Sequence, residues 1–316
     1  MLTRIGTRLS LANVIKRLVS LGSVIVDLIL EVPAFPDRGG DVLASQRGMV
    51  AGGAFNVLSA AARLGLPGIY AGQHGTGPFG DLVRAALTGQ GVPAIMPPSL
   101  DLDTGWTLAL IEPDGERTFV TVTGADAVVA PDSLRSIEYR DGDAVYVSGY
   151  DLAYPNAGGA IADHVATLAS GLVVVLDPGP LVADIEAGRL ATALRRVDIL
   201  SLNRRELDAL GGLKPVMSLV RREATVVLRE GPDGAAIHRA GSTPLTVPSV
   251  PVKAVDTSGA GDVHVGANLA GLARGMTWPD AVRLANRAAA YAVSRPGPAA
   301  GPTDEELREF GATRWE

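Results

Sequence analysis

A glycine-rich turn that leads into a helix carries the clearest chemistry in this sequence. Residues 256–262 read Asp-Thr-Ser-Gly-Ala-Gly-Asp, and a small-residue apolar pattern after them predicts a helix. The free backbone N–H groups of Gly259, Ala260 and Gly261 would attract an anion through hydrogen bonds and the helix dipole. Asp262 places a carboxylate where that anion would bind. It could simply cap the helix, or it could act as a general base that takes a proton from an attacking hydroxyl.

A second glycine-rich segment supplies groups that suit a polyol. Residues 51–56 read Ala-Gly-Gly-Ala-Phe-Asn. Gly52 and Gly53 let the backbone approach a ligand closely, and the amide of Asn56 can both donate and accept hydrogen bonds. Asp27 follows the first predicted strand, at the edge where open α/β sheets bind ligands. Tight helix packing would also explain the glycines, so the polyol interpretation depends on the carboxylate and the amide.

Two further patterns are weaker. Asn203-Arg204-Arg205-Glu206 follows a strand-like segment and is also what an ordinary helix start with solvated charges looks like. Gly231-Pro232-Asp233-Gly234 predicts a turn between two strands, which many proteins contain.

Predicted strands and helices alternate along the chain between these segments. Short apolar runs predict strands, and longer patterns between them predict helices. This order favours a doubly wound, mainly parallel sheet flanked by helices. We expect strands over 19–26, 68–71, 144–147, 173–176 and 225–228, and helices over 54–64, 79–87, 156–169, 190–196 and 204–210.

Three further expected strands have no crossover helix between them. They cover residues 42–50, 104–111 and 117–122, and the turn signal Pro113-Asp114-Gly115-Glu116 joins the last two as a hairpin. Such strands predict a small accessory sheet. A small sheet beside a large α/β domain often covers a ligand site, although an ordinary edge hairpin would give the same pattern.

Composition excludes several classes of function. The 316 residues include no Cys, which excludes a disulfide scaffold, a thiolate metal site and a cysteine nucleophile. The net charge of −6 argues against a nucleic-acid partner. The chain also lacks the glycine-rich lysine motif of P-loop enzymes. A phosphate site must therefore depend on backbone N–H groups, metal and arginine.

The N-terminal segment looks like an addition to the domain. Residues 1–18 contain Arg4, Arg8, Lys16 and Arg17 and no acidic residue, and they lack the features of a signal peptide. No apolar run is long enough to span a membrane. We therefore expect an N-terminal extension over 1–18, a single domain over 19–316, no membrane partner and a cytoplasmic protein.

Taken together and in this order, these segments resemble the ribokinase-like (PfkB) family of carbohydrate kinases from residue 18 to residue 310. The closest correspondence is that of residues 256–262 with the family's D-T-x-G-A-G-D signature. The others are residues 51–56 with its G-G-x-x-N signature, 203–206 with its N-x-x-E element, 105–124 with its lid hairpin, and 285–302 with its C-terminal nucleotide and cation loop.

The resemblance implies an ATP-dependent kinase that transfers the γ-phosphoryl group of ATP to a hydroxyl of a small sugar or nucleoside. It implies a doubly wound domain with a small β-sheet lid, whose strands would fall at about 28–50 and 104–123. Asp262 would be the catalytic base. Gly259, Ala260 and Gly261 would form the anion hole for the transferring group.

The resemblance also assigns binding roles. Asn203 and Glu206 would organise Mg²⁺ and its waters near the phosphates. A monovalent cation such as K⁺ could bind at Asp256, with help from backbone carbonyls nearby. In all, the acceptor residues would be Asp27, Gly52, Gly53 and Asn56; the nucleotide residues Asn203, Glu206, Gly231, Gly234 and Asn286; and the K⁺ residues Asp256, Ser258, Ala292, Arg295 and Gly297.

The sequence departs from the ribokinase pattern in several places. Ile25 stands where ribokinases have Asn, and the motif over 51–56 lacks their lysine, so ribose itself is in doubt. Gly77 replaces a common Asp. His264 and Asn268 replace aromatic and apolar residues, and we expect His264 to pack beneath the site. The first two changes do not touch the phosphoryl-transfer groups.

Three alternatives stay open. Arg38 and Arg47 could bind the phosphate of a sugar phosphate, although a solvated lid face is the preferred interpretation, so an unphosphorylated sugar or related polyol is favoured. Phe35, Phe55 and Trp106 could form a wall for the base of a nucleoside. A non-catalytic sensor could keep the fold and bind a small ligand. The resemblance also allows a homodimer that pairs through the lid.

Overall fold

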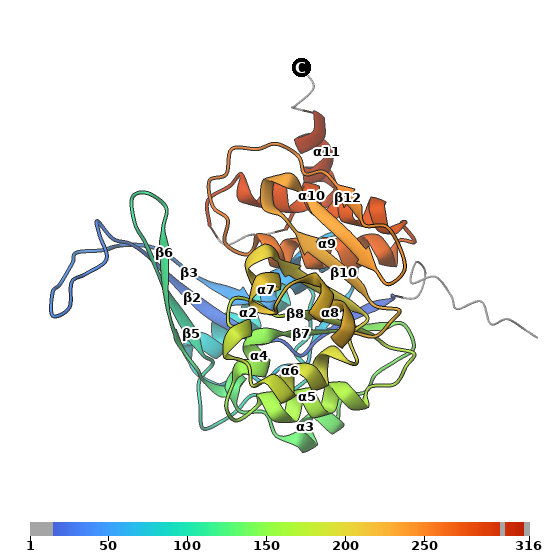
Figure 1. The fold of residues 1–316 in the computed structure, drawn as a ribbon. Coiled ribbons are helices and arrows are strands. Elements are labelled where there is room, and N and C mark those ends of the chain that lie inside the picture. The colour runs from blue at the N-terminus through green and yellow to red at the C-terminus, as the bar shows by residue number, and fades with distance from the viewer. Residues whose placement is uncertain (1–14, 298–300, 313–316) are drawn as a thin grey trace, which may run out of the picture.

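Two separate sheets form the framework of the structure, a computed structural model that describes residues 15–297 and 301–312 (Figure 1). The main sheet has the order β12-β11-β10-β9-β8-β7-β1-β4, in which the strands from β10 to β4 are parallel and β11 and β12 form an antiparallel edge. The predicted mainly parallel sheet is therefore confirmed. Its strands are β1 Arg17–Ser20, β4 Gly68–Tyr70, β7 Asp143–Ser148, β8 Val173–Asp177, β9 Ile199–Asn203, β10 Thr225–Arg229, β11 Ala235–Arg239 and β12 Leu245–Val247.

Helices cover both faces of the main sheet because its strands are apolar on both sides. Along β7, Val145 and Val147 join one core cluster, whereas Ala144 and Tyr146 join the other. The first cluster packs against α3 Pro131–Arg135, α4 Gly149–Ala153, α5 Gly158–Thr167, α6 Ala187–Leu194, α7 Arg204–Ala209 and α8 Leu213–Leu219. The second packs against α1 Ala54–Arg63, α2 Pro78–Gly89, α9 Ala260–Ala273, α10 Trp278–Val293 and α11 Asp304–Ala312. Short 3₁₀ turns cover Ala125–Ala127, Val182–Asp184 and Gly231–Asp233.

The small sheet has the order β3-β2-β5-β6 and projects to one side of the main sheet (Figure 1). Its strands are β2 Val24–Glu31, β3 Ser45–Gly53, β5 Trp106–Ile111 and β6 Arg117–Val122. The predicted hairpin is confirmed, since β5 and β6 pair antiparallel on either side of the Pro113–Glu116 turn. The sheet begins at Val24, somewhat before the position near 28 expected for the lid.

The expectation of one strand over 19–26 was wrong. The segment contains the end of β1, which lies in the main sheet, and the start of β2, which lies in the small sheet. The chain leaves the main sheet at Gly22, where a side chain would approach the ring of Tyr146 to 3.1 Å. The backbone N–H of Ser23 then donates to the buried carboxylate of Asp151 at 2.9 Å. Gly22 and Ser23 interrupt the apolar residues of this segment, and they lie between the end of β1 and the start of β2.

The ends of the chain also differ from expectation. β1 begins at Arg17, inside the predicted extension, and the Arg17 Nε donates to Asp143 Oδ1 at 2.9 Å. Residues 1–14 of that extension lie outside the described residues. Near the other end, α10 continues to Val293, so the part of the predicted loop 285–302 that contains Asn286 is helical. None of the helices in the described ranges is long and apolar enough to cross a membrane.

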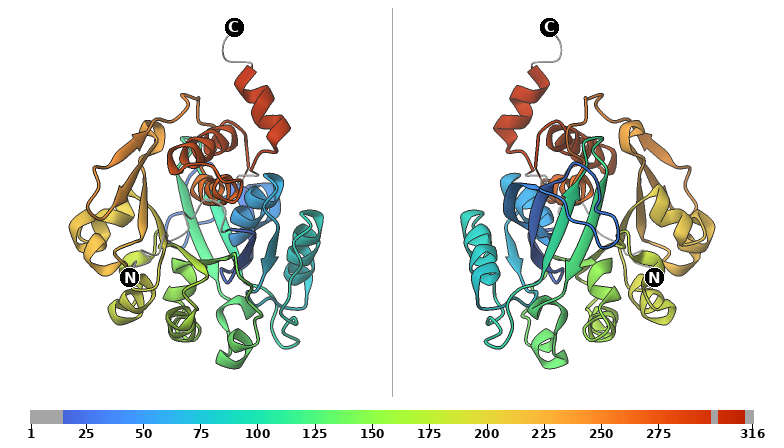
Figure 2. Two further views of the ribbon diagram at one scale, coloured as in Figure 1. Left: turned by 90° about the vertical axis from the view of Figure 1, so that its right-hand side faces the viewer. Right: turned by 90° about the vertical axis from the view of Figure 1, so that its left-hand side faces the viewer.

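The last helix, α11, extends beyond α10 at one end of the molecule (Figure 2). A reciprocal pair of hydrogen bonds caps its start, since Glu306 N donates to Thr303 Oγ1 at 3.2 Å and Thr303 N donates to Glu306 Oε2 at 2.7 Å. Glu306 also forms an ion pair with Arg63 of α1 at 2.7 Å, which holds α11 against the second layer of helices.

The unusual Gly77 has a structural reason. It precedes α2 with φ of +129°, and a side chain there would come within 2.7 Å of Asp103 Oδ2. The Asp103 carboxylate instead accepts hydrogen bonds from the N–H groups of Phe79 and Gly80 at 3.1 and 2.8 Å. A carboxylate from another segment thus caps α2 in place of a local side chain.

Candidate active site

Three polar residues meet where neighbouring parallel strands end. Asp177, Asn203 and Arg229 are the last residues of β8, β9 and β10, which lie side by side in the main sheet. Arg229 Nη1 donates to Asp177 Oδ2 at 2.6 Å, and Nη2 donates to Glu206 Oε2 at 3.3 Å. Burial acts to lower the pKa of Arg229, but the charges of Asp177 and Glu206 raise it on balance, so the guanidinium stays charged.

Sequence reasoning missed Asp177 and Arg229. The signal that could have found them was their position, because each is the polar residue that ends an apolar strand. The carboxyl ends of parallel strands share one edge of the sheet, which is where open α/β sheets bind ligands.

Asn203 and Glu206 form the start of α7 and contact the same cluster. Asn203 Oδ1 accepts from Glu206 N at 3.0 Å, and Glu206 Oε2 accepts from Asn203 N at 2.7 Å, which is a capping box. The helix-start interpretation of this motif is therefore confirmed. Burial and the charge of Asp177 raise the pKa of Glu206, whereas Arg229 opposes that shift. One segment thus serves as a cap and brings a carboxylate to the edge of the sheet.

The glycine-rich turn leads into α9 as expected. Gly259 is its N-cap residue with φ of +70°, which favours glycine. A side chain at Gly261 would lie 2.8 Å from Arg229 Nη1, so the guanidinium sits directly behind the turn. In the described part of the chain, the N–H groups of Gly259 and Gly261 have no backbone acceptor, whereas Ala260 N donates to Thr257 O at 3.3 Å. Free donors and a positive charge therefore converge where an anion would bind.

Asp262 lies in the first turn of α9, and its side chain is hydrogen-bonded to a residue of another helix. Asn56 Nδ2, in the first turn of α1, donates to Asp262 Oδ2 at 3.2 Å. Burial and the nearby Asp177 raise the pKa of Asp262 to about 7, although the Asn56 hydrogen bond and the charge of Arg229 act against this rise. A carboxylate with a pKa near neutrality is well matched to accept a proton from a hydroxyl.

The small sheet brings a second carboxylate to this site. Burial raises the pKa of Asp27 on β2 to about 6, and its charge contributes to the raised pKa of Asp262. Gly52 on β3 leaves room for it, since a side chain there would lie 2.0 Å from Asp27 Oδ2. Gly53 has φ of +62°, and a side chain there would meet the carbonyl oxygen of Ser23 at 2.5 Å. The structure therefore brings these predicted acceptor residues together beside Asp262.

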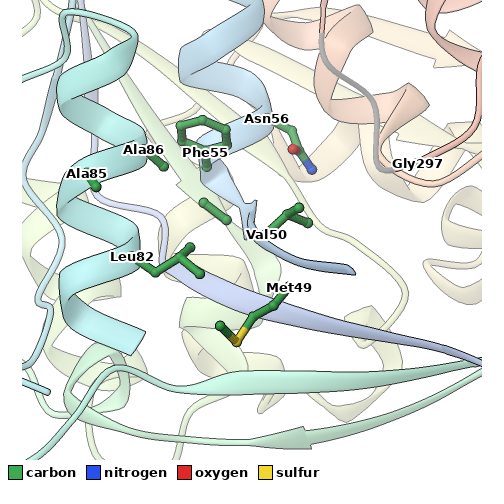
Figure 3. A pocket seen from close by; sticks show the side chains of 9 residues that line it. Met49, Val50, Phe55, Asn56, Leu82, Ala85, Ala86 and Gly297 are labelled. Carbon is green, nitrogen blue, oxygen red and sulfur yellow. The ribbon is translucent and has the colours of Figure 1, made fainter. Parts of the chain in front are cut away.

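A cavity of about 560 Å³ opens next to Asn56 (Figure 3). Its walls are mostly apolar and come from β3, α1 and α2. Of the three aromatic residues predicted to face a base, only Phe55 lines this cavity. Trp106 packs against Phe79 with ring centroids 6.1 Å apart, and Phe35 is exposed. The lining residues are Met49, Val50, Ala51, Phe55, Asn56, Leu82, Ala85, Ala86 and Gly297.

Two of the predicted nucleotide residues shape a turn. Gly231 and Gly234 lie at either end of the turn between β10 and β11, with φ of +59° and +100°, so the predicted turn is confirmed. A side chain at Gly234 would lie 2.1 Å from the carbonyl oxygen of Val247. Their assignment to nucleotide binding stays a prediction.

Asn286 is buried and already bonded. Its Nδ2 donates to the carbonyl oxygen of Val247 at 2.9 Å, and its Oδ1 lies 3.1 Å from His264 Nε2. Burial lowers the pKa of His264 to about 3, so its ring is neutral. His264 therefore packs within the protein, as expected, while Asn286 holds the segment after β12.

The residues predicted to hold a monovalent cation gather around Asp256. Its Oδ1 accepts from Ser258 N at 2.9 Å, and its Oδ2 accepts from Gly297 N at 3.2 Å. Arg117 of β6 also donates to Oδ1, at 2.6 Å, and was not expected here. At the end of α10, Arg295 N donates to the carbonyl oxygen of Ala292 at 3.1 Å.

A comparison of the whole chain with known protein families agrees with this geometry. The model of the pfkB family carbohydrate kinases matches residues 15–305. The chain belongs to the pfkB carbohydrate kinase family. As a member of that family, it is a phosphotransferase with an alcohol group as acceptor.

Individual relatives match the pfkB-family chain along almost its whole length. An uncharacterized sugar kinase, YegV, of Escherichia coli is 32% identical and covers 91% of each chain. An ATP-dependent ribose-1-phosphate kinase of Halopiger xanaduensis is 29% identical over 95% of this chain and 99% of its own length. The structure of Arabidopsis thaliana ribokinase with ribose and ATP shares the fold, with a TM-score of 0.75, 23% identity, and coverage of 94% of this chain and 98% of that one.

Proposed function

We propose that this kinase transfers the γ-phosphoryl group of ATP to a hydroxyl of a small unphosphorylated sugar or related polyol. The observation that carries the proposal is the Asp262 carboxylate, which has a pKa of about 7 and lies beside free backbone donors at the start of α9. A base and an anion-binding turn are thereby joined in one helical turn, which is what transfer to a hydroxyl requires.

The chemical step follows from these positions. Asp262 accepts the proton of the acceptor hydroxyl while the hydroxyl oxygen forms a bond to the γ-phosphorus. The bond from that phosphorus to the bridging oxygen breaks, and ADP leaves with the electron pair. The N–H groups of Gly259 and Gly261 would donate to the charge that spreads over the transferred group, and the positive charge of Arg229 next to this turn would help to stabilise it.

The residues at the sheet edge fit Mg²⁺ that arrives with the phosphates of ATP. Within the described ranges no cluster of three or more His, Asp or Glu residues forms a metal cage. Both oxygens of Glu206 already accept hydrogen bonds, from Asn203 and Arg229. Mg²⁺ usually keeps several waters and takes few protein ligands, so Glu206 would orient those waters. When bound, the ion would neutralise phosphate charge.

Charge around the acceptor site supports an unphosphorylated acceptor. Asp27 and Asn56 offer a carboxylate and an amide, which suit hydroxyl groups. Of the two arginines considered for a sugar phosphate, Arg47 already pairs with Glu31 at 2.6 Å, and Arg38 is exposed. An acceptor that carries its own phosphate would bring a second negative charge near Asp27, and Arg47 is already paired with Glu31.

The test compares ADP release by the wild type and by Asp262→Asn across sugars, sugar phosphates and nucleosides. Removal of the base should reduce turnover by about 10²- to 10⁴-fold, while ATP still raises the melting temperature. Asp163→Asn, on the exposed side of α5, is the matched control and should keep full turnover. Near-normal turnover in Asp262→Asn would refute its role as the base.

A nucleoside kinase is the second candidate. The apolar cavity with Phe55 on its wall favours it, because such a wall suits a nucleobase (Figure 3). Turnover of nucleosides with no turnover of sugars in the same assay would select this candidate. Ligand-induced stabilisation with no ADP formed from any acceptor would instead favour a sensor.

We also propose that two copies of the chain pair through the small sheet. β6 is an edge strand of that sheet, and it exposes Phe119 and Val120. An edge strand offers unpaired backbone groups to a second strand, and exposed apolar side chains add area to such a contact. Light scattering coupled to size exclusion would measure the mass, and a monomer at every concentration would refute the pairing.

A further inference from the structure

An arginine from the small sheet reaches the turn that precedes the catalytic helix. Arg117 is the first residue of β6, and Asp256 lies 139 positions later in the chain. Arg117 Nη2 donates to Asp256 Oδ1 at 2.6 Å, and Nη1 donates to Thr257 Oγ1 at 3.2 Å. The side chains of the pair are 18% and 6% exposed, so water screens this ion pair only weakly.

The same carboxylate ties together three segments of the chain. Besides the bond from Arg117, Asp256 accepts hydrogen bonds from the backbone N–H groups of Ser258 and Gly297. Ser258 belongs to the turn that continues into Gly259 and α9, and Gly297 follows α10. A displacement of Asp256 would therefore also displace the turn that carries the anion-binding N–H groups.

These contacts do not fit a monovalent cation at Asp256. Both carboxylate oxygens already accept hydrogen bonds, and a guanidinium supplies the positive charge that a cation would bring. A second cation would be repelled by Arg117. The carbonyl oxygen of Ala292, one of the other predicted ligands, accepts a hydrogen bond from Arg295 N.

We propose that Arg117 is a positioning residue whose guanidinium neutralises Asp256, so that the kinase works without a monovalent cation. The charge that orders the turn before α9 then comes from the small sheet. The anion-binding turn is ordered when β6 lies against it, and removal of Arg117 leaves the buried carboxylate with its two backbone hydrogen bonds but without the positive charge of the guanidinium. This inference rests on the proposed kinase function only for its kinetic consequence.

The experiment measures turnover and melting temperature in KCl and in choline chloride at equal ionic strength. The wild type should show the same values in both salts. Arg117→Met should lose about tenfold or more in turnover, because a misplaced turn no longer faces the transferring group. In that variant KCl should raise both turnover and melting temperature above their values in choline chloride, since K⁺ can then reach Asp256.

Two further variants separate positioning from general stability. Arg117→Lys keeps the positive charge and should remain insensitive to K⁺, with turnover above that of Arg117→Met. Arg283→Met removes an exposed arginine that pairs with Asp280 on α10, and it should change neither turnover nor the response to salt. A merely structural role for Arg117 would lower the melting temperature equally in both salts.

Three results would overturn the inference. They are activation of the wild type by K⁺, unchanged turnover in Arg117→Met, and loss of turnover in Arg117→Met that KCl does not relieve. The melting temperatures need no acceptor. If no acceptor is phosphorylated, the proposed function fails while the salt response of the melting temperature still tests the pairing of Arg117 with Asp256.

Discussion

Asn56 Nδ2 lies 3.2 Å from Asp262 Oδ2, so an amide at the start of α1 holds the carboxylate at the start of α9. The two residues are 206 positions apart in the chain. The hydrogen bond favours the charged form of the carboxylate and limits the rise in the pKa of Asp262 that burial causes. This hydrogen bond therefore connects the segment proposed to bind the acceptor with the turn proposed to support phosphoryl transfer.

Activity should depend on pH through Asp262. The carboxylate must be deprotonated to accept a proton, and its pKa is about 7. We expect kcat/KM to fall about tenfold for each pH unit below that value, and Asn56→Ala should move this acidic limb to higher pH because a bond to the charged form is lost. Asp177→Asn removes a negative neighbour and should move the limb to lower pH. Limbs that do not shift in either variant would show that another group controls the profile.

The carboxyl group of Asp262 should also make the folded protein less stable at high pH. Because folding raises the pKa of Asp262 from 3.8 to about 7, the folded state holds the proton more tightly than the unfolded state does. The stabilisation that the protonated Asp262 gives to the folded state is complete below the pKa of the unfolded state. It is lost as the pH rises through the pKa of the folded state. The side chain in Asp262→Asn cannot ionise. This variant should therefore have a higher melting temperature than the wild type above about pH 7. Equal melting temperatures across the whole pH range would contradict the raised pKa.

Gly52 should be essential for the acceptor site. A side chain there would lie 2.0 Å from Asp27 Oδ2, so Gly52→Ala must displace that carboxylate. We expect KM for the acceptor to rise about tenfold or more, with a smaller change in KM for ATP. Gly48→Ala on the same strand is the matched control, because no atom lies within 4 Å of the added methyl group. Equal kinetics in the two variants would argue against a role for Asp27.

Stability should depend on the close approach of α1 and α9. A side chain at Gly266 would meet the carbonyl oxygen of Val57 at 2.4 Å, so Gly266→Ala should destabilise the fold by about 1–3 kcal/mol. Gly159→Ala in α5 meets no atom within 4 Å and should instead stabilise the fold by about 0.5–1 kcal/mol. Urea unfolding of both variants measures whether each change lowers or raises the free energy of unfolding. A neutral Gly266→Ala would mean that the two helices can move apart freely.

Local signals in the sequence were sufficient for β4, β7, β8 and β10 of the main sheet, for the β5–β6 hairpin and for the start of α9. Apolar runs with turn residues between them mark such elements because the preference for strand, turn or helix is set by near neighbours. The change of sheet between β1 and β2 is marked locally only by Gly22 and Ser23. Which sheet each strand joins depends on its partners, since β1 pairs with β7 and β2 pairs with β5, both far away in the sequence.

The spacing within 256–262 was enough to identify a carboxylate next to free N–H groups in one helical turn. The surroundings of this carboxylate depend on the three-dimensional fold. Asp177 and Arg229 reach the site because β8 and β10 end at the same edge of the sheet, and Arg117 reaches Asp256 because the small sheet lies against the turn. Charge interactions of this kind depend on distance in space, which the order of residues along the chain does not specify.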